Sequence, residues 1–351
     1  MKRALAACLA LALGGCASMA GDRAAPQRDV GYDAFAQLQA AGFAGDFAIS
    51  QPGEVDTIYY GAAEEEAETR AVDGWPWASV TKQVMAVLVM REVDAGRLSL
   101  ESDAADFVPA LRGRGITVRH LLQHRAGLPN PDDTPKDSRG FPSFYGSQAD
   151  PLAFCTGDGE APRDDAAWEY NNCDYIVLGG VLERSSGSSL DLLLAQGIGL
   201  QSGWINTALL EPGEERDFAG RSAVTARRIA GYGAAGALVG PLDDMLLFDR
   251  ALMDGTLLSE ESLATLWQGD PAMGYMALGQ WVFETTLTGC ETPVRIVERR
   301  GAIGNYKVRN IILPDLDIAM AMATEQADFD FGAIWTGQGA LHHTLASVAC
   351  R

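Results

Sequence analysis

Short runs that suit strands, bounded by turn residues, lie toward both ends of the chain, and apolar residues follow a helical period between them. Two short runs on either side of a Gln-Pro-Gly turn predict a hairpin of strands at residues 47–50 and 57–60. Apolar residues at helical spacing predict helices at about residues 79–95, 117–123, 175–185, 243–253 and 333–349. The last third predicts strands at residues 279–286, 293–299, 306–313 and 316–324.

This order of elements predicts the fold class α/β, in its α+β form. Because the hairpin strands come first and the other strands last, we expect one sheet built from both ends of the chain, with the helices as an insertion. A mostly helical subdomain is expected at about residues 95–240. Residues 129–144, rich in Pro, Asp, Gly and Ser, predict a long loop, and the acidic run at residues 63–68 predicts a solvated one.

The N-terminus has the pattern of a targeting signal. Two basic residues precede an apolar stretch at residues 4–13, which is too short to remain as a membrane-spanning helix. The Leu-Gly-Gly-Cys that ends at Cys16 resembles the lipobox of bacterial lipoproteins. The resemblance implies that residues 1–15 are a signal peptide and that lipids on Cys16 anchor the protein to a membrane. An ordinary secretory signal is the alternative.

By the same resemblance, the expected location is the cell envelope, on the periplasmic face of the outer membrane. Residues 16–30 are then a flexible tether, and residues 31–351 form one large domain. The net charge of −20 makes nucleic acid an unsuitable partner, because its phosphates carry charge of the same sign.

Four cysteines remain once the signal peptide and Cys16 are set aside. They are Cys155, Cys173, Cys290 and Cys350, an even number that predicts two disulfides in an oxidising compartment. Three pairings are open, and we favour Cys155–Cys173 with Cys290–Cys350 because each pair is local to one region. A metal site is disfavoured, because no C-x-x-C or nearby His pairing occurs.

The first candidate for chemistry is the tetrapeptide Ser-Val-Thr-Lys at Ser79 to Lys82. Residues three apart on a helix share a face, so a hydroxyl and an amine lie within reach of each other. A serine nucleophile with a lysine base needs that pairing. The chain has only four Lys, and Arg cannot lose its proton as a buried Lys can. The alternative is a surface Lys near a helix start.

Two further motifs carry suitable groups. Tyr170 and Asn172 form a Y-x-N, in which the phenol can act as a base beside a positive charge such as Lys82, and the amide can orient a substrate or the Lys. The alternative is a packed tyrosine. Gly301 and Ala302 lie near the end of a predicted strand, where glycine on an edge lets a substrate backbone approach. Backbone N–H groups there and at Ser79 are candidates for an oxyanion hole, and a charged edge strand with a turn is the alternative.

The order S-x-x-K, Y-x-N and basic-x-Gly resembles the serine β-lactamase and penicillin-binding-protein superfamily. The closest branch is class C-like, which includes family VIII esterases and D-alanyl-D-alanine carboxypeptidase-like proteins. Three connecting segments resemble blocks of that family, from about residue 35 to 345. They are residues 115–129 (the "ITVRHLLTHTSGLP" segment), 170–183 (the "YSN" block) and 233–248 (the "GAGGL" block).

The resemblance implies an antiparallel sheet flanked by helices and a set of roles without a cofactor or metal. Ser79 becomes the acylated nucleophile, and Lys82 and Tyr170 share its proton as general base. Asn172 contacts the substrate amide or Lys82, and the backbone N–H groups of Ser79 and Ala302 hold the oxyanion. The implied partner is a small-molecule or peptide substrate with an ester or amide bond.

One position departs from the family pattern. Where the family has K-T-G or H-x-G, this chain reads Arg299-Arg300-Gly301. Arg299 can still bind a carboxylate, but it cannot relay a proton as Lys or His can. The resemblance therefore favours an esterase or D-Ala-D-Ala carboxypeptidase-like hydrolase, with β-lactamase activity weak. A catalytically inactive penicillin-binding-like sensor of the cell envelope is the alternative.

Two histidines offer a weaker candidate for a different kind of site. His120 and His124 are four residues apart, a spacing that can bind zinc. No H-E-x-x-H motif accompanies them, so structural roles are favoured.

Overall fold

The computed structural model describes residues 29–54, 56–61, 74–138, 140–147, 150–163, 167–211 and 225–350. The predicted signal peptide, Cys16, all but the end of the tether and the acidic run at residues 63–68 lie outside this part of the chain. Those predictions therefore stay predictions.

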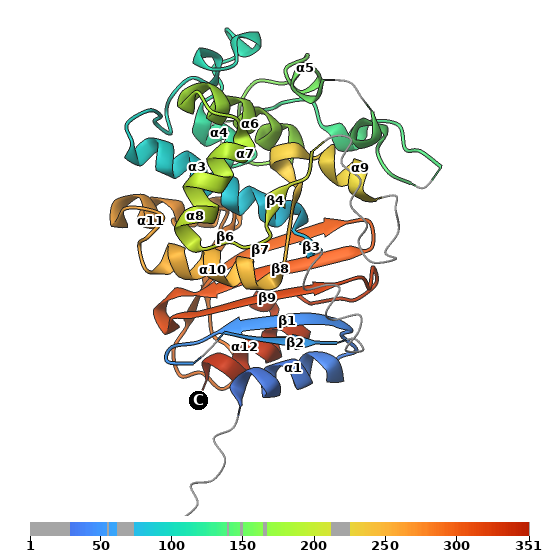
Figure 1. Ribbon diagram of the computed structural model, residues 1–351, viewed down its shortest axis with the longest axis vertical. Helices are drawn as coiled ribbons and strands as arrows, with labels where there is room; N and C mark the ends of the chain where they lie inside the picture. The colour runs from blue at the N-terminus through green and yellow to red at the C-terminus, as the bar shows by residue number, and fades with distance from the viewer. Residues whose placement is uncertain are drawn as a thin grey trace, which may run out of the picture.

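A six-stranded antiparallel sheet forms the base of the molecule (Figure 1). Its strand order is β2-β1-β9-β8-β7-β6. The strands are β1 (Gly45–Ser50), β2 (Thr57–Tyr60), β6 (Trp281–Thr285), β7 (Val294–Ile303), β8 (Tyr306–Leu313) and β9 (Ile318–Thr324). The pairing of Ala48 with Ala321 joins the first strand to the last. The sheet is thus built from both ends of the chain, as the sequence pattern predicts.

Helices cover both faces of this sheet. Every residue of β1 and β9 is buried, which fits strands enclosed on two sides. The helices α1 (Val30–Ala40) and α12 (Ala340–Ala349) pack together on one face, and α10 (Leu242–Met253) crosses the other (Figure 1). The α+β class with an antiparallel sheet flanked by helices is confirmed.

The helices between β2 and β6 form a layer beyond α10 (Figure 1). Its central pair is α3 (Thr81–Asp94) and α6 (Asn172–Ser186), which contact each other. Around them lie α4 (Val118–Leu122), α5 (Pro151–Cys155), α7 (Leu190–Leu194), α8 (Leu200–Ser202), α9 (Thr225–Ala230) and α11 (Glu260–Leu266). A small sheet of β3 (Trp75–Pro76), β5 (Leu238–Gly240) and β4 (Ala208–Leu209) connects this layer to the main sheet. The bounds of a separate subdomain at residues 95–240 remain a prediction.

Three elements differ from the sequence-based expectation. Helix α1 was not expected, although Asp29 caps it by accepting a hydrogen bond from the Tyr32 N–H. The helix expected at residues 333–349 begins only at Ala340, because Gly337 and Gly339 have φ of 73° and 95°, which an α-helix does not allow. Strand β7 continues four residues beyond the predicted end, to Ile303.

Both favoured disulfides are present. Cys155 at the end of α5 is bonded to Cys173 on α6. Cys290, between β6 and β7, is bonded to Cys350 at the end of α12. The first bond therefore anchors the segment before α6 next to Asn172, and the second holds the C-terminal helix to the sheet.

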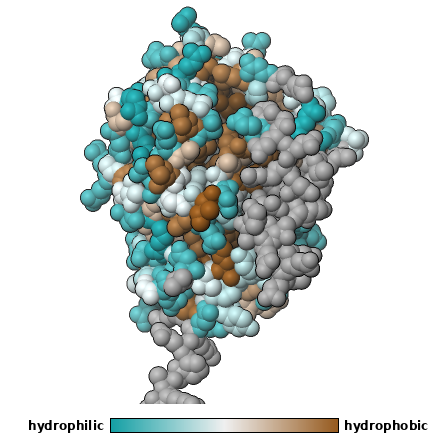
Figure 2. Space-filling model, viewed as in Figure 1, coloured by the Kyte–Doolittle hydropathy of each residue, from teal (hydrophilic) through white to brown (hydrophobic). Residues whose placement is uncertain are grey.

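The surface of the described part is mixed in character. Figure 2 shows hydrophilic side chains along the rim of the viewed face and apolar ones in patches nearer its middle. Within the described ranges, no helix has the length and apolar character needed to cross a membrane.

Candidate active site

Ser79 lies in a tight turn that packs against strands β7 and β8 of the main sheet. The turn is the 3₁₀ segment η1 (Ala78–Val80), after which α3 begins at Thr81. Ala78 has φ of 48°, in the left-handed region that non-glycine residues seldom adopt. Such strain just before a serine is typical of functional turns. The turn places Ser79 directly before the N-terminus of the buried helix α3.

Gly301 on β7 is the residue that lets the sheet approach this turn. A methyl group at Gly301 would lie 2.5 Å from the Trp77 carbonyl oxygen and 3.2 Å from the Ser79 nitrogen. Although β7 lies between β6 and β8 in the strand order, Gly301 pairs with β8 alone, so the edge expected at this glycine is present locally. The pairing with β6 ends at Glu298, so the neighbouring Ala302 remains exposed.

Lys82 is fully buried one turn after Ser79, on the same face of α3. Its Nζ lies 3.2 Å from Ser79 Oγ, 2.7 Å from Asn172 Oδ1 and 2.6 Å from the Ala235 carbonyl oxygen. Burial, and then the charge of Arg299, lower the pKa of Lys82 well below its ordinary value. The surroundings therefore favour a neutral amine, which is the form that can accept a proton.

Tyr170 approaches Ser79 from the other side. Its Oη lies 2.5 Å from Ser79 Oγ, and Lys82 Nζ lies 4.9 Å from the centre of its ring. Desolvation raises the pKa of Tyr170, while the charge of Arg299 and the hydrogen bond with Ser79 lower it in part. The positive charge that was expected from Lys82 thus comes from Arg299. The phenol keeps its proton, so Tyr170 is better suited to donate one than to accept one.

Arg299, on strand β7, is fully buried and lies next to Ser79 and Tyr170. Its Nε donates to the Ser79 carbonyl oxygen at 2.9 Å, and its Nη2 lies 3.5 Å from Tyr170 Oη. Nη1 is buried without a hydrogen-bond partner among the described residues. The structure therefore places Arg299 at the backbone of Ser79 and beside the phenol of Tyr170.

Arg300 has a different environment, although it is the next residue. Both its Nε and Nη2 donate to the carboxylate of Glu298, each at 2.8 Å. Its guanidinium also lies over the rings of Trp281 and Trp335, at 5.6 and 4.8 Å from their centres. The charge of Arg300 is thus balanced by Glu298, and Arg299 alone of the two lowers the pKa of Lys82.

Two residues that carry no recognisable sequence signal complete the site. Tyr145 Oη lies 2.7 Å from Asn172 Nδ2 and 2.6 Å from Asp132 Oδ1. The Tyr145 ring also stacks on Tyr232, with 3.7 Å between the ring centres. Asp132 belongs to the segment expected as a loop, residues 129–144, and Tyr145 directly follows it, so no periodic pattern marks either side chain.

The two histidines take the structural positions that were favoured. His120 closes the capping box of α4 by accepting from the Thr117 N–H. His124 is buried behind Tyr170, with 4.6 Å between the ring centres. Across the described ranges, no group of three or more His, Cys, Asp or Glu side chains is arranged to hold a metal ion.

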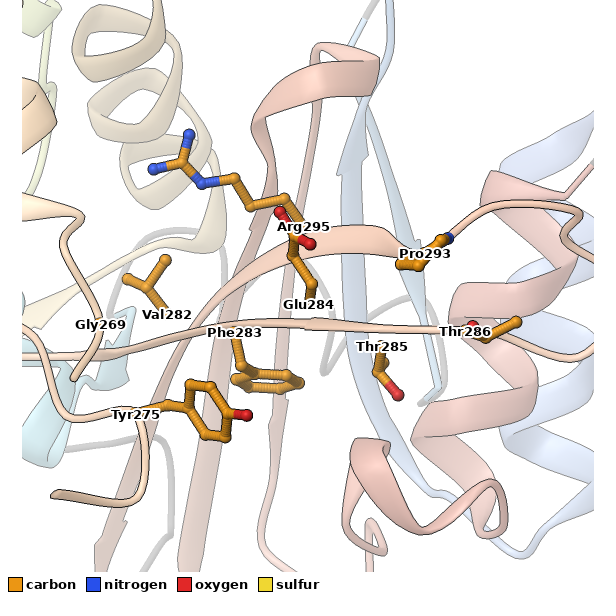
Figure 3. A pocket seen from close by; sticks show the side chains of 9 residues that line it. All are labelled: Gly269, Tyr275, Val282, Phe283, Glu284, Thr285, Thr286, Pro293 and Arg295. Carbon is orange, nitrogen blue, oxygen red and sulfur yellow. The ribbon is translucent and has the colours of Figure 1, made fainter. Parts of the chain in front are cut away.

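A separate cavity of about 630 Å³ lies along β6 (Figure 3). Glu284 and Arg295, which are paired across β6 and β7, extend to one side of the strand, and Tyr275 and Phe283 lie on the other (Figure 3). Ser79, Lys82 and Tyr170 do not line it. The groups suited to acyl transfer are therefore gathered around Ser79 and not in this cavity.

Comparisons with known proteins agree with this geometry. The family model described as Beta-lactamase matches residues 33–342. Penicillin-binding protein 4 of Amycolatopsis lactamdurans is 32% identical over 119 residues, which are 32% of this chain and 30% of that protein. Esterase EstB of Burkholderia gladioli is 29% identical over 157 residues, which are 35% and 36% of the two chains. The chain spans between 29% and 59% of the length of the curated relatives it matches.

Solved structures show the same fold. The D-amino acid amidase from Ochrobactrum anthropi SV3 complexed with D-phenylalanine superposes with a TM-score of 0.70 at 18% identity, over 90% of this chain and 99% of that one. The penicillin binding protein from Bacillus halodurans has a TM-score of 0.66 at 17% identity, over 90% and 98%. Fold and family match together confirm what the order of the motifs indicated: the chain belongs to the beta-lactamase family of hydrolases.

Proposed function

We propose that the protein is a serine hydrolase that cleaves an ester or amide bond through an acyl-enzyme on Ser79. The observation that carries this proposal is the position of the Ser79 hydroxyl, 3.2 Å from the amine of Lys82 and 2.5 Å from the phenol of Tyr170. A weak nucleophile needs such neighbours to take its proton and to pass one to the leaving group.

Acylation begins with neutral Lys82 as the general base. As Ser79 Oγ attacks the substrate carbonyl, its proton moves to Lys82 Nζ, a new O–C bond forms and the carbonyl oxygen becomes an oxyanion. Backbone N–H groups of Ser79 and Ala302 are the proposed donors to this oxyanion. The burial that lowers the pKa of Lys82 makes the amine available for this step.

The tetrahedral intermediate then breaks down with the help of Tyr170. The bond from the carbonyl carbon to the leaving oxygen or nitrogen breaks, and the phenol supplies the proton that this atom takes up. The proton that Lys82 took from Ser79 then passes to the phenolate, which restores both groups; it does not pass through Ser79 Oγ, because that oxygen is now bonded to the acyl carbon. A water molecule then repeats the sequence at the acyl-enzyme, which releases the acid and restores Ser79.

Esters and amides of small molecules or peptides are the proposed substrates. The similar proteins are named as an esterase, penicillin-binding proteins and a D-amino acid amidase, and one fold can serve different chemistries. Arg299 is directed at the Ser79 carbonyl oxygen and is fully buried, so it is poorly placed to hold an antibiotic carboxylate. We therefore propose an esterase or D-Ala-D-Ala carboxypeptidase-like activity, with β-lactam hydrolysis weak.

We further propose that Cys16 is lipidated and that the protein faces the periplasm from the outer membrane. This proposal rests on the lipobox-like sequence alone. Replacing Cys16 with Ser is expected to move the protein from the membrane fraction to the soluble fraction. An unchanged distribution would contradict the anchor.

Turnover assays test the hydrolase proposal. The domain is given a short-chain p-nitrophenyl ester, a D-alanyl-D-alanine peptide and a penicillin, alongside Ser79→Ala. We expect Ser79-dependent release of nitrophenol or D-alanine and slower loss of the penicillin. Equal turnover by Ser79→Ala would refute the role of this serine, and a folded protein without turnover on all three would favour the inactive sensor.

A further inference from the structure

Whether Lys82 can act as a base depends on where its amine directs its lone pair. A neutral amine has two protons to donate and one lone pair to accept with. The Ala235 carbonyl oxygen, 2.6 Å away, can only accept, so it takes one proton. If Asn172 accepts the second proton at 2.7 Å, the lone pair is left for Ser79 at 3.2 Å. The amide of Asn172 must therefore present its oxygen, and not its nitrogen, to Lys82.

The hydrogen bonds behind Asn172 determine the orientation of this amide. Tyr145 Oη lies between Asp132 Oδ1, at 2.6 Å, and the Asn172 amide, at 2.7 Å. A carboxylate accepts but does not donate, so the single proton of the phenol points to Asp132. Tyr145 must then accept from Asn172, and only the amide nitrogen can donate. The amide oxygen is thereby turned toward Lys82.

The phenol of Tyr145 is well suited to hold this polarity. The side chain is 1% exposed, and burial together with the charge of Asp132 raises the pKa of Tyr145, so the proton stays in place. The ring stacks on Tyr232 with the planes only 8° apart. Tyr232 directly precedes the turn η7 (Gly233–Ala235), which presents the other acceptor of Lys82. One pair of stacked rings thus supports both acceptors of the amine.

We propose that Asp132 and Tyr145 are positioning residues for acylation: they orient the Asn172 amide and so leave the lone pair of Lys82 directed at Ser79. The inference rests on the proposed function, because it takes Lys82 as the base. Neither residue touches the reacting hydroxyl, and both act through Asn172. Asp132 is an exposed residue of the turn η4 (Pro131–Asp133), so its replacement disturbs no core packing.

Asp132→Asn is the sharpest perturbation, because it allows the chain of hydrogen bonds to reverse. An amide at position 132 can donate to Tyr145, which frees the phenol proton for Asn172 and permits its amide to turn. The lone pair of Lys82 is then drawn toward Asn172 and away from Ser79. We expect the plateau of kcat/KM for a p-nitrophenyl ester to fall about tenfold or more, through kcat and with KM nearly unchanged.

A change of pH profile separates this effect from a general disturbance. The charges that act on Lys82 are Arg299 on β7, which lowers its pKa, and Asp132 and Asp174, which raise it. Loss of the charge at Asp132 is therefore expected to move the acidic limb of kcat/KM to lower pH while the plateau falls. The matched control is Asp133→Asn, which removes the neighbouring carboxylate of the same turn and is expected to leave both plateau and limb unchanged.

A double-mutant cycle tests whether Asp132 acts through Tyr145. Tyr145→Phe keeps the stacked ring and removes the hydroxyl, so the plateau is expected to fall here as well. Because both residues belong to one chain of hydrogen bonds, Asp132→Asn combined with Tyr145→Phe is expected to be no slower than Tyr145→Phe alone. Independent effects that multiply in the double variant would overturn the inference.

Labelling by a fluorophosphonate distinguishes a failure of the positioning role of Asp132 and Tyr145 from a failure of the proposed serine hydrolase function. Normal labelling of wild-type Ser79 with an equal rate in Asp132→Asn overturns the positioning role and leaves the hydrolase proposal standing. A change in KM alone for the p-nitrophenyl ester in Asp132→Asn also overturns the positioning role and leaves the hydrolase proposal standing. Wild-type protein that is folded but unlabelled at Ser79 overturns both. Slower labelling in Asp132→Asn and Tyr145→Phe, with Asp133→Asn at the wild-type rate, supports the inference.

Discussion

Replacing Arg299 with Met is expected to shift the acidic limb of kcat/KM to higher pH. The guanidinium carbon of Arg299 lies 5.7 Å from the centre of the Tyr170 ring, and Lys82 Nζ lies 4.9 Å from it. The two charges are therefore no more than about 11 Å apart. At an effective dielectric constant of about 20, their repulsion is about 1.5 kcal/mol.

The direction follows from the sign of the charge. The cation at Arg299 disfavours the ammonium form and lowers the pKa of Lys82. Without that cation the pKa rises, so Lys82 keeps its proton to higher pH and the limb moves up. Arg299→Lys keeps a positive charge, and its limb is expected to stay near that of the wild type even if its plateau falls.

The assay is the pH dependence of p-nitrophenyl ester hydrolysis for the wild type and both variants. Loss of the hydrogen bond from Arg299 to the Ser79 carbonyl oxygen lowers the plateau in any variant that cannot replace it. The position of the limb reports the charge separately. Identical limbs for the Met and Lys variants, or a limb that moves to lower pH in the Met variant, would refute the electrostatic reasoning.

Two further predictions concern the packing of Gly301 against the turn that holds Ser79, and the two disulfides. Gly301→Ala places a methyl group 2.5 Å from the Trp77 carbonyl oxygen, at the start of the turn that holds Ser79. We expect the free energy of unfolding to fall by about 1–3 kcal/mol and the labelling of Ser79 by a fluorophosphonate to slow more than tenfold. Unchanged stability and labelling would contradict this contact. Serine in place of both members of the Cys155–Cys173 bond, which are 18 residues apart, is expected to cost about 3 kcal/mol in urea unfolding. For the Cys290–Cys350 bond, which spans 60 residues, about 4 kcal/mol is expected, and a smaller loss than for the first bond would contradict the loop-entropy argument.

Much of the fold could be predicted from apolar runs and their order along the chain. The strands of the last third were recognised from such runs, and the order of elements led us to expect one sheet that also contains the first hairpin, as the pairing of β1 with β9 shows. Helix α1 escaped prediction because its apolar face, with Ala34, Phe35 and Leu38, is narrow and packs on α12, about 300 residues further along the chain. Only the folded chain supplies that partner.

The site divides in the same way. The spacing of Ser79 and Lys82 is enough to predict that both lie on one face of a helix, because helical geometry is local. The orientation of Asn172 could not be predicted, because it depends on Tyr145 from an irregular segment and on a carboxylate beyond it. The sequence predicted that a substrate backbone approaches Gly301, whereas in the structure the turn at residues 77–79 lies against this glycine. Contacts between distant segments carry no signal in one sequence.

Intact-mass and peptide-mapping measurement after reaction with a fluorophosphonate shows whether Ser79 is the nucleophile. We expect one adduct per chain, located on the peptide that contains Ser79, and no adduct in Ser79→Ala. An adduct that persists in Ser79→Ala, or a folded wild-type protein that forms none, would contradict the assignment of Ser79 as the nucleophile.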